Sequence, residues 1–152
     1  MLKSALPSDK DSTTILIRIM VGVVFLSEGI QKFIFPELGI ERFMAIGFRF
    51  PGFLAHFVGF IEIFFGICIV LGLLTRLAVL PLLLIMIFAF ETTKFYIINE
   101  TGLWHFMHED RTDFAMQIGL LFLLLKGSGN WSFDNLILQY LNKNNTFIQQ
   151  HN

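Results

Sequence analysis

The sequence predicts an all-α membrane protein in which four transmembrane helices pack as a bundle. Of its 152 residues, 55% are hydrophobic and only 15% are charged, whereas a soluble domain carries about a quarter charged residues. Long apolar segments dominate the chain, and they lack the polar face that a soluble amphipathic helix turns to water. Because lipid leaves backbone amides without partners, such segments are expected to cross a membrane as helices.

The boundaries of the four spans follow from length and from helix-breaking residues. A helix needs about 20 residues to cross a hydrocarbon core about 30 Å thick. Pro36 and Pro51 bound the first two spans, and Gly127 follows the last. The spans are predicted at about residues 14–35, 52–74, 76–98 and 112–126. The chain then divides into a cytoplasmic N-terminal segment, a four-helix transmembrane domain and a cytoplasmic C-terminal tail, at residues 1–13, 14–134 and 135–152.

The placement of lysine and arginine predicts that both termini are cytoplasmic. Four spans put the termini on one side, together with the short connection between the second and third spans. That side carries Lys3, Lys10, Arg18, Arg76, Lys126 and Lys143, whereas the other carries Arg42, Arg49 and Arg111. By the positive-inside rule, the side with more basic residues faces the cytoplasm. Arg18 and Arg76 are interpreted as anchors at that interface.

Composition also excludes several classes of function. The net charge is −1, so no basic surface predicts nucleic-acid binding. Cys68 is the only cysteine, which excludes disulfide frameworks and CxxC redox pairs within one chain. His105 and His108 are two histidines three residues apart, and their spacing specifies no further ligand, so no metal site is predicted. The first apolar segment is too long for a secretory signal and is read as an uncleaved helix.

Polar residues inside the predicted spans are the candidate ligand-binding residues. A charge at the centre of a membrane helix costs about 2.5–3.5 kcal/mol, so each one needs a reason. Glu62 falls near the middle of its span, and the other candidates fall in the half away from the termini. If the polar helix faces point inward, they form one cluster that opens toward the outer surface. Its members are Lys32, Glu62, Glu28, Glu91, Lys94, Asp113 and Gln117.

A purely structural interpretation of these charges remains open. Glu28 and Lys32 are four residues apart with the acid first, which favours a pair within one helix. Glu91 and Lys94 are three apart and can neutralise each other in the same way, and both lysines can extend toward the headgroups. Glu62 has no such partner on its own helix, which favours a functional role for this residue.

Several short motifs, taken in order, carry a resemblance to a known family. They are Arg18-Ile-Met-Val-Gly22, Gly29-x-x-Lys32, Gly47-Phe-x-Phe-Pro51, Glu62-x-x-x-Gly66, Gly72-Leu-x-Thr75-Arg76 and Gly127-x-Gly129-x-x-Ser132-x-Asp134. This set, over residues 14–134, resembles the DoxX family of small bacterial membrane proteins. The resemblance implies a four-helix bundle in the bacterial cytoplasmic (inner) membrane and an association with quinone-linked oxidoreductases. It assigns no catalytic residue.

Two hypotheses about function follow. In the first, the chain is a redox-associated subunit that binds a quinone-like ring in the polar cluster. Lys32 and Glu62 would contact the ring oxygens, and aromatic side chains would hold the ring: Phe25, Phe33, Phe60, Phe64 and Phe95. The sequence contains no flavin, haem or iron–sulfur motif, so a partner oxidoreductase or membrane subunit would supply electrons. In the second, the chain is a non-enzymatic scaffold or assembly subunit, or a carrier for a small solute, and a carrier of this size would need to dimerise.

Overall fold

The computed structural model describes residues 12–94 and 103–150, without the side chains of residues 93–94, 103, 105–106, 109 and 143–150. Every regular element in these ranges is helical. The elements are α2 (Thr14–Ile34), α3 (Ile40–Ala45), α4 (Pro51–Leu71), α5 (Thr75–Ala89), the π-helix η1 (Phe90–Lys94), α7 (Leu103–Lys126) and α8 (Phe133–Gln150). Thus the predicted all-helical class is confirmed.

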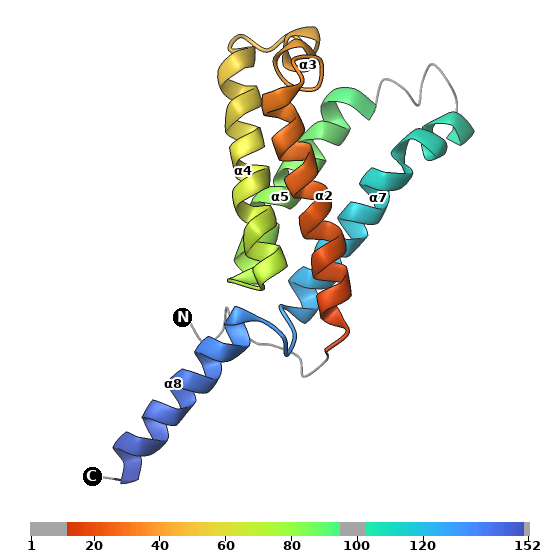
Figure 1. The fold of residues 1–152 in the computed structure, drawn as a ribbon. Helices are drawn as coiled ribbons and strands as arrows, with labels where there is room; N and C mark the ends of the chain where they lie inside the picture. The colour runs from red at the N-terminus through yellow and green to blue at the C-terminus, as the bar shows by residue number, and fades with distance from the viewer. Residues whose placement is uncertain (1–11, 95–102, 151–152) are drawn as a thin grey trace.

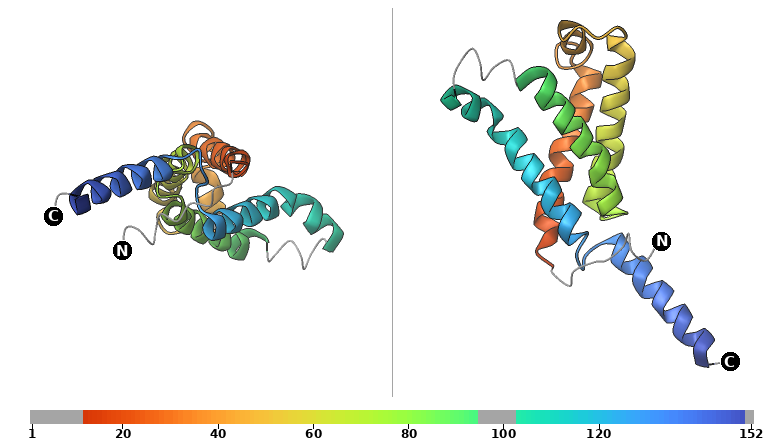
Figure 2. Two further views of the ribbon diagram at one scale, coloured as in Figure 1. Left: turned by 90° about the horizontal axis from the view of Figure 1, so that it is seen from below. Right: turned by 180° about the vertical axis from the view of Figure 1, so that it is seen from behind.

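Helices α2, α4, α5 and α7 form the bundle, as Figure 1 shows. Helix α3 covers one end of it, which we call the α3 end, and α8 extends away from the other, which we call the α8 end. The view from below in Figure 2 shows α8 and the first turns of α7 directed to opposite sides of the bundle. Helices α2 and α4 share the most extensive contact in the bundle.

Three of the helices described here are long and apolar enough to cross a membrane: Thr14–Ile34, Pro51–Leu71 and Thr75–Thr92. Helix α7 has 24 residues and begins at Leu103, nine residues before the predicted start of the fourth span. The difference arises because the fourth span was bounded by its apolar residues, whereas charged residues also form helix readily. Every 18-residue stretch of α7 includes its acidic and basic residues Glu109, Asp110, Arg111 and Asp113.

Two pairs of glycines let α2 and α4 approach until their backbones touch. A methyl group added at Gly29 would lie 2.7 Å from the carbonyl oxygen of Gly59, and one added at Gly22 would lie 2.9 Å from that of Gly66. The contacts are reciprocal, because a methyl group at Gly59 or Gly66 would lie 3.1 Å from the carbonyl oxygen of Gly29 or Gly22, respectively. Small residues are typical of membrane helix interfaces, where close packing drives association.

Arg18 ties three segments together near the α8 end. Its side chain is only 2% exposed. The guanidinium donates to four backbone carbonyls, those of Ile69 (3.0 Å), Val70 (2.7 Å), Ser128 (2.7 Å) and Trp131 (2.6 Å). Two of these belong to the last turn of α4, where carbonyls lack partners within the helix. The interpretation of Arg18 as an interfacial anchor is therefore wrong, because its guanidinium donates hydrogen bonds to protein carbonyls inside the fold.

The turn between α4 and α5 is held by Asp134 from the start of α8. Gly72 ends α4 in a left-handed conformation with φ of 67°, and a side chain there would collide with the Arg18 guanidinium. The carboxylate of Asp134 accepts hydrogen bonds from the amides of Leu74 (2.6 Å) and Thr75 (3.2 Å). It thereby caps the N-terminus of α5, where free amides and the helix dipole favour an anion.

The glycine contacts predict a selective loss of stability. Gly29→Ala should lower the thermal midpoint of the detergent-solubilised protein, with a cost of about 1–3 kcal/mol from overpacking. Gly52→Ala is the matched control, because nothing lies within 4 Å of a methyl group at Gly52. Equal midpoints for the two variants, measured by fluorescence-detected size exclusion after heating, would contradict this packing.

The Arg18 contacts predict that its geometry matters as well as its charge. Arg18→Lys keeps the charge but cannot reach four carbonyls, and each buried acceptor left unsatisfied costs about 1–3 kcal/mol. We expect a large drop in thermal midpoint for Arg18→Lys. Arg76→Lys should have a much smaller effect, because the hydrogen bond of that side chain to Leu125 O, at 2.6 Å, is exposed. Indistinguishable midpoints would argue against this role for Arg18.

Candidate functional site

An ion pair joins α2 and α4 beside the close contact of Gly29 and Gly59. Lys32 Nζ lies 2.7 Å from Glu62 Oε2, and both side chains are largely buried. Each charged residue follows a glycine of its own helix by three positions and packs against the glycine of the other. A methyl group at Gly29 would lie 3.0 Å from the Cβ of Glu62, and one at Gly59 would lie 3.4 Å from the Cβ of Lys32. The glycines thus make room for the ion pair.

Lys32 also contacts Glu28, one turn earlier on α2. Lys32 Nζ lies 3.9 Å from Glu28 Oε2, and it donates a hydrogen bond to the backbone carbonyl of Glu28 at 3.4 Å. Glu28 is about half exposed, so this contact is weak compared with the buried pair. Glu62 Oε2 is buried and, beyond the ion pair with Lys32, accepts no hydrogen bond within the described residues. Its carboxylate therefore has capacity for a further donor.

A cavity of about 410 Å³ lies beside the ion pair, between the bundle helices toward the α3 end. Its size is in the range of sites that hold small molecules, about 300–1,000 Å³. The wall is mostly apolar, with Lys32 and Glu62 among its polar members. An apolar cavity with a few converging polar groups is the usual form of a ligand site.

The structure brings together four of the seven predicted site residues. Four of them line the cavity: Glu28, Lys32, Glu62 and Asp113. Glu91 is exposed and, like Gln117, does not line the cavity. The side chain of Lys94 lies outside the described residues.

Three further polar residues of the cavity were missed by the sequence analysis: Arg42, Thr92 and Thr112. Arg42 lies on α3, which returns over the end of the bundle, and it is close enough to Glu62 to interact with it electrostatically. The signal that was available is the spacing of Arg42, Phe43 and Ile46, which is compatible with one face of a short helix. No helix was predicted between the first two spans, so this signal was not used.

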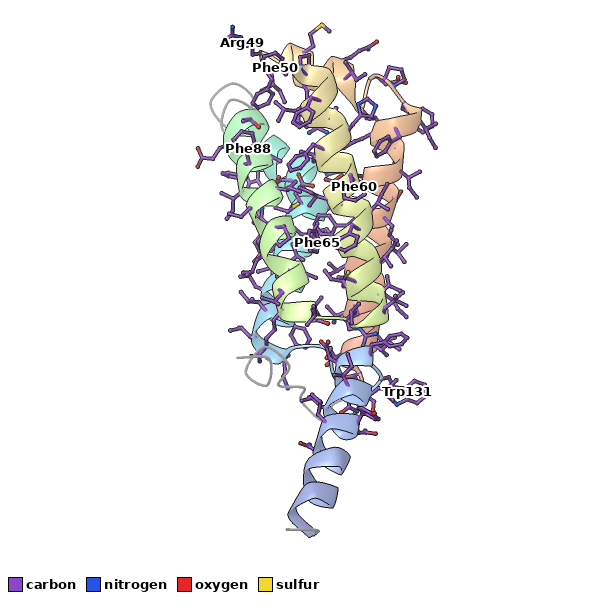
Figure 3. All side chains as sticks on the ribbon, turned by 90° about the vertical axis from the view of Figure 1, so that its left-hand side faces the viewer. Arg49, Phe50, Phe60, Phe65, Phe88 and Trp131 are labelled. Atoms are coloured by element: carbon purple, nitrogen blue, oxygen red, sulfur yellow. The ribbon has the colours of Figure 1, made fainter. Side chains whose placement is uncertain are left out.

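The aromatic wall of the cavity also differs from the predicted one. Phe25 lines the cavity as expected, together with Phe43, Phe48, Phe57 and Phe88. Phe33, Phe60 and Phe64 do not line it and are about half exposed or more, and Phe95 lies outside the described residues. Figure 3 shows Phe60 on α4, outside the bundle interior. The prediction failed for these three because depth in the membrane was counted but the direction around the helix was not.

The arrangement offers a hydrogen-bond donor and an acceptor side by side in an apolar site. The Lys32 ammonium can donate to a carbonyl oxygen, and the Glu62 carboxylate can accept from a hydroxyl group. Such pairs interact strongly with a ligand when water is excluded. No group of three or more His, Cys, Asp or Glu side chains within the described ranges is arranged to hold a metal ion.

The family model for DoxX matches residues 13–96, a segment that includes both partners of the ion pair and the glycines beneath them. The chain belongs to the DoxX family. This DoxX protein is 46% identical over 129 residues to "Uncharacterized membrane protein Rv3486" of Mycobacterium tuberculosis, with 80% of the chain and 79% of that protein covered. The chain is therefore a membrane protein.

A second relative carries a name that refers to redox chemistry. The DoxX chain is 29% identical over 126 residues to "Putative oxidoreductase CatD" of Bacillus subtilis, with 83% of this chain and 87% of that protein covered. No solved structure matches the chain.

Several residues of the motifs that carry the family resemblance gather at two places in the fold. Gly29, Lys32 and Glu62 lie at the ion pair and the cavity. Arg18, Gly72, Ser132 and Asp134, in contrast, meet at the α8 end. The DoxX pattern therefore combines residues that hold the bundle together with residues that line a cavity.

The ion pair predicts non-additive effects on stability. Lys32→Met leaves Glu62 as an uncompensated buried charge, a change that typically costs about 3–5 kcal/mol. The double variant Lys32→Met/Glu62→Gln removes both charges and should be more stable than Lys32→Met alone. The thermal midpoints of the wild type, the two single variants and the double variant test this. Additive losses would show that the pair is not coupled.

Proposed function

We propose that this DoxX protein binds a quinone-like ring in the cavity beside Lys32 and Glu62 and acts as a quinone-linked subunit of a redox system. The observation that carries the proposal is the buried Lys32–Glu62 pair on the wall of a ring-sized, mostly apolar cavity. A quinone oxygen accepts a hydrogen bond and a hydroquinone oxygen donates one, and this site holds a partner for each state.

The residues of this chain would bind, orient and exchange protons. Phe25 and Phe57 on the cavity wall would confine the ring in offset or edge contacts. Lys32 would hold one ring oxygen, and Glu62 would take or return the proton that accompanies a change of oxidation state. Glu28 is about half exposed and contacts Lys32, and it would carry that proton to water. The quinone supplies the redox chemistry when bound, and a partner oxidoreductase supplies the electrons.

The proposed setting is the cytoplasmic (inner) membrane of a bacterium, with four spans and both termini in the cytoplasm. Helix α7 would be the fourth span, with the predicted segment 112–126 in the hydrocarbon. Its charged first half would lie at the outer interface, next to the α3 end. The excess of basic residues on the side of the termini supports this orientation, and the redox-related name of the Bacillus subtilis relative supports the redox role.

A second candidate function is a scaffold or assembly subunit without chemistry. The observation that favours it is the glycine packing beneath the ion pair, because a pair built into a helix contact can serve the fold alone. Neutralising the site residues distinguishes the two functions. Loss of a ligand from a folded protein favours quinone binding, whereas loss of the folded protein itself favours the scaffold.

Native mass spectrometry of gently solubilised protein, combined with lipid extraction, tests the proposal. The wild type should carry a stoichiometric quinone, and Lys32→Met and Glu62→Gln should lose it. The double variant Lys32→Met/Glu62→Gln, which is expected to be more stable than Lys32→Met, should lose the quinone while remaining folded. Glu91→Gln is the matched control, because Glu91 is an exposed acid beside the cavity helices that does not line the cavity. A wild type without any small molecule but with a retained protein partner would refute quinone binding and favour the scaffold.

A further inference from the structure

Part of the cavity wall faces the outside of the bundle between α4 and α5. Three residues there line the cavity and are nevertheless strongly exposed: Phe57 (49%), Leu84 (68%) and Phe88 (54%). A side chain that touches both a cavity and the outer surface lies at an opening. All three are apolar and belong to helical segments apolar enough to cross a membrane, so this opening faces lipid rather than water.

At Leu84 the opening reaches the depth of the ion pair, and Phe57 and Phe88 lie more than one turn farther toward the α3 end. Leu84 is nine residues after Thr75, where α5 begins, and Glu62 is nine residues before Leu71, where α4 ends. At 1.5 Å per residue, both lie roughly 13–14 Å above the turn that joins the two helices. The route from the ion pair to the outer surface past Leu84 therefore runs along the membrane plane.

The rim of the cavity at the α3 end has the opposite character. Arg42 and Glu28 line it and are exposed. The Arg42 side chain makes no hydrogen bond or ion pair that involves a described residue, so its charge is available to water or to a polar ligand group. Beside it, Phe48 stacks on Phe88 with ring centroids 5.8 Å apart, and Figure 3 shows Phe88 near the α3 end of α5. The stacked pair separates the polar rim from the apolar opening.

We propose that the cavity takes a ring compound with an apolar tail, and that the tail leaves between α4 and α5 into the bilayer. The ring would lie against Lys32 and Glu62, and the tail would pass Leu84 among the lipid chains. The ligand class is then a membrane-dissolved isoprenoid quinone, and not a free, water-soluble ring. This inference rests on the proposed function of the same site and adds the direction of access.

Two probes with the same ring test the inference. Menaquinone with a short isoprenoid tail and menadione, which lacks the tail, are titrated into the full-length protein in nanodiscs. The variant Leu84→Trp fills the opening without changing a polar group. Leu80→Trp is the matched control, because Leu80 is also exposed, lies one turn away on α5 and does not line the cavity.

We expect Leu84→Trp to bind the tailed probe roughly tenfold more weakly and menadione as the wild type does, with Leu80→Trp unchanged for both. Retained menadione binding also shows that the variant is folded. Leu84→Ala, which widens the opening, should accelerate association of the tailed probe.

Three results would overturn the inference without refuting the proposed function. In the first, Leu84→Trp weakens the binding of both probes equally, and in the second it weakens the binding of neither. Both results leave the proposed quinone site in place. In the third, the wild type binds only menadione, which removes the tail route and keeps the ring site. A wild type that binds neither probe refutes the proposed function itself, and this inference with it.

Discussion

The structure depends on a close backbone contact between α2 and α4 that buries two opposite charges. A lysine and a glutamate inside a membrane protein are costly to desolvate, and their attraction offsets that cost only when they are near each other and water is excluded. Gly29 and Gly59 let the helices approach, and Lys32 and Glu62 occupy the space that each glycine leaves on the facing helix. The ion pair and the helix packing are therefore one feature.

The two ends of the bundle handle polar groups in different ways. At the α8 end, the donors of Arg18 and the carboxylate of Asp134 satisfy helix-terminal backbone groups, which leaves a closed and tightly bonded turn. Toward the α3 end, Glu62 Oε2 accepts no hydrogen bond in the described part of the chain beyond its ion pair with Lys32, and a cavity lies beside it. The α8 end therefore holds the helices together, whereas the α3 end has the ion pair beside a cavity.

The sequence predicted the helices well, because bilayer physics couples apolar length to helical structure. It also placed Glu28, Lys32, Glu62 and Asp113 together, from their depth and from polar helix faces that point inward. It failed for Glu91 because the direction of that side chain around the helix was not taken into account. Ile85, Phe88 and Thr92 line the cavity at helical spacing, whereas Glu91 is exposed on another side of the helix. It missed Arg42 because α3 is so short that the helical spacing of Arg42, Phe43 and Ile46 covers little more than one turn and was not assigned to a helix.

The central claim is that Lys32 and Glu62 form a direct ion pair inside the membrane, at the wall of a ligand site. Solid-state NMR on the protein in lipid, with lysine labelled with ¹⁵N and glutamate with ¹³C, measures this directly, with Glu62→Gln to assign the signal. The account predicts a strong dipolar coupling between Lys32 Nζ and the Glu62 carboxyl carbon that changes when a quinone is added. Absence of the coupling would contradict the ion pair, and a coupling that no quinone alters would contradict the site.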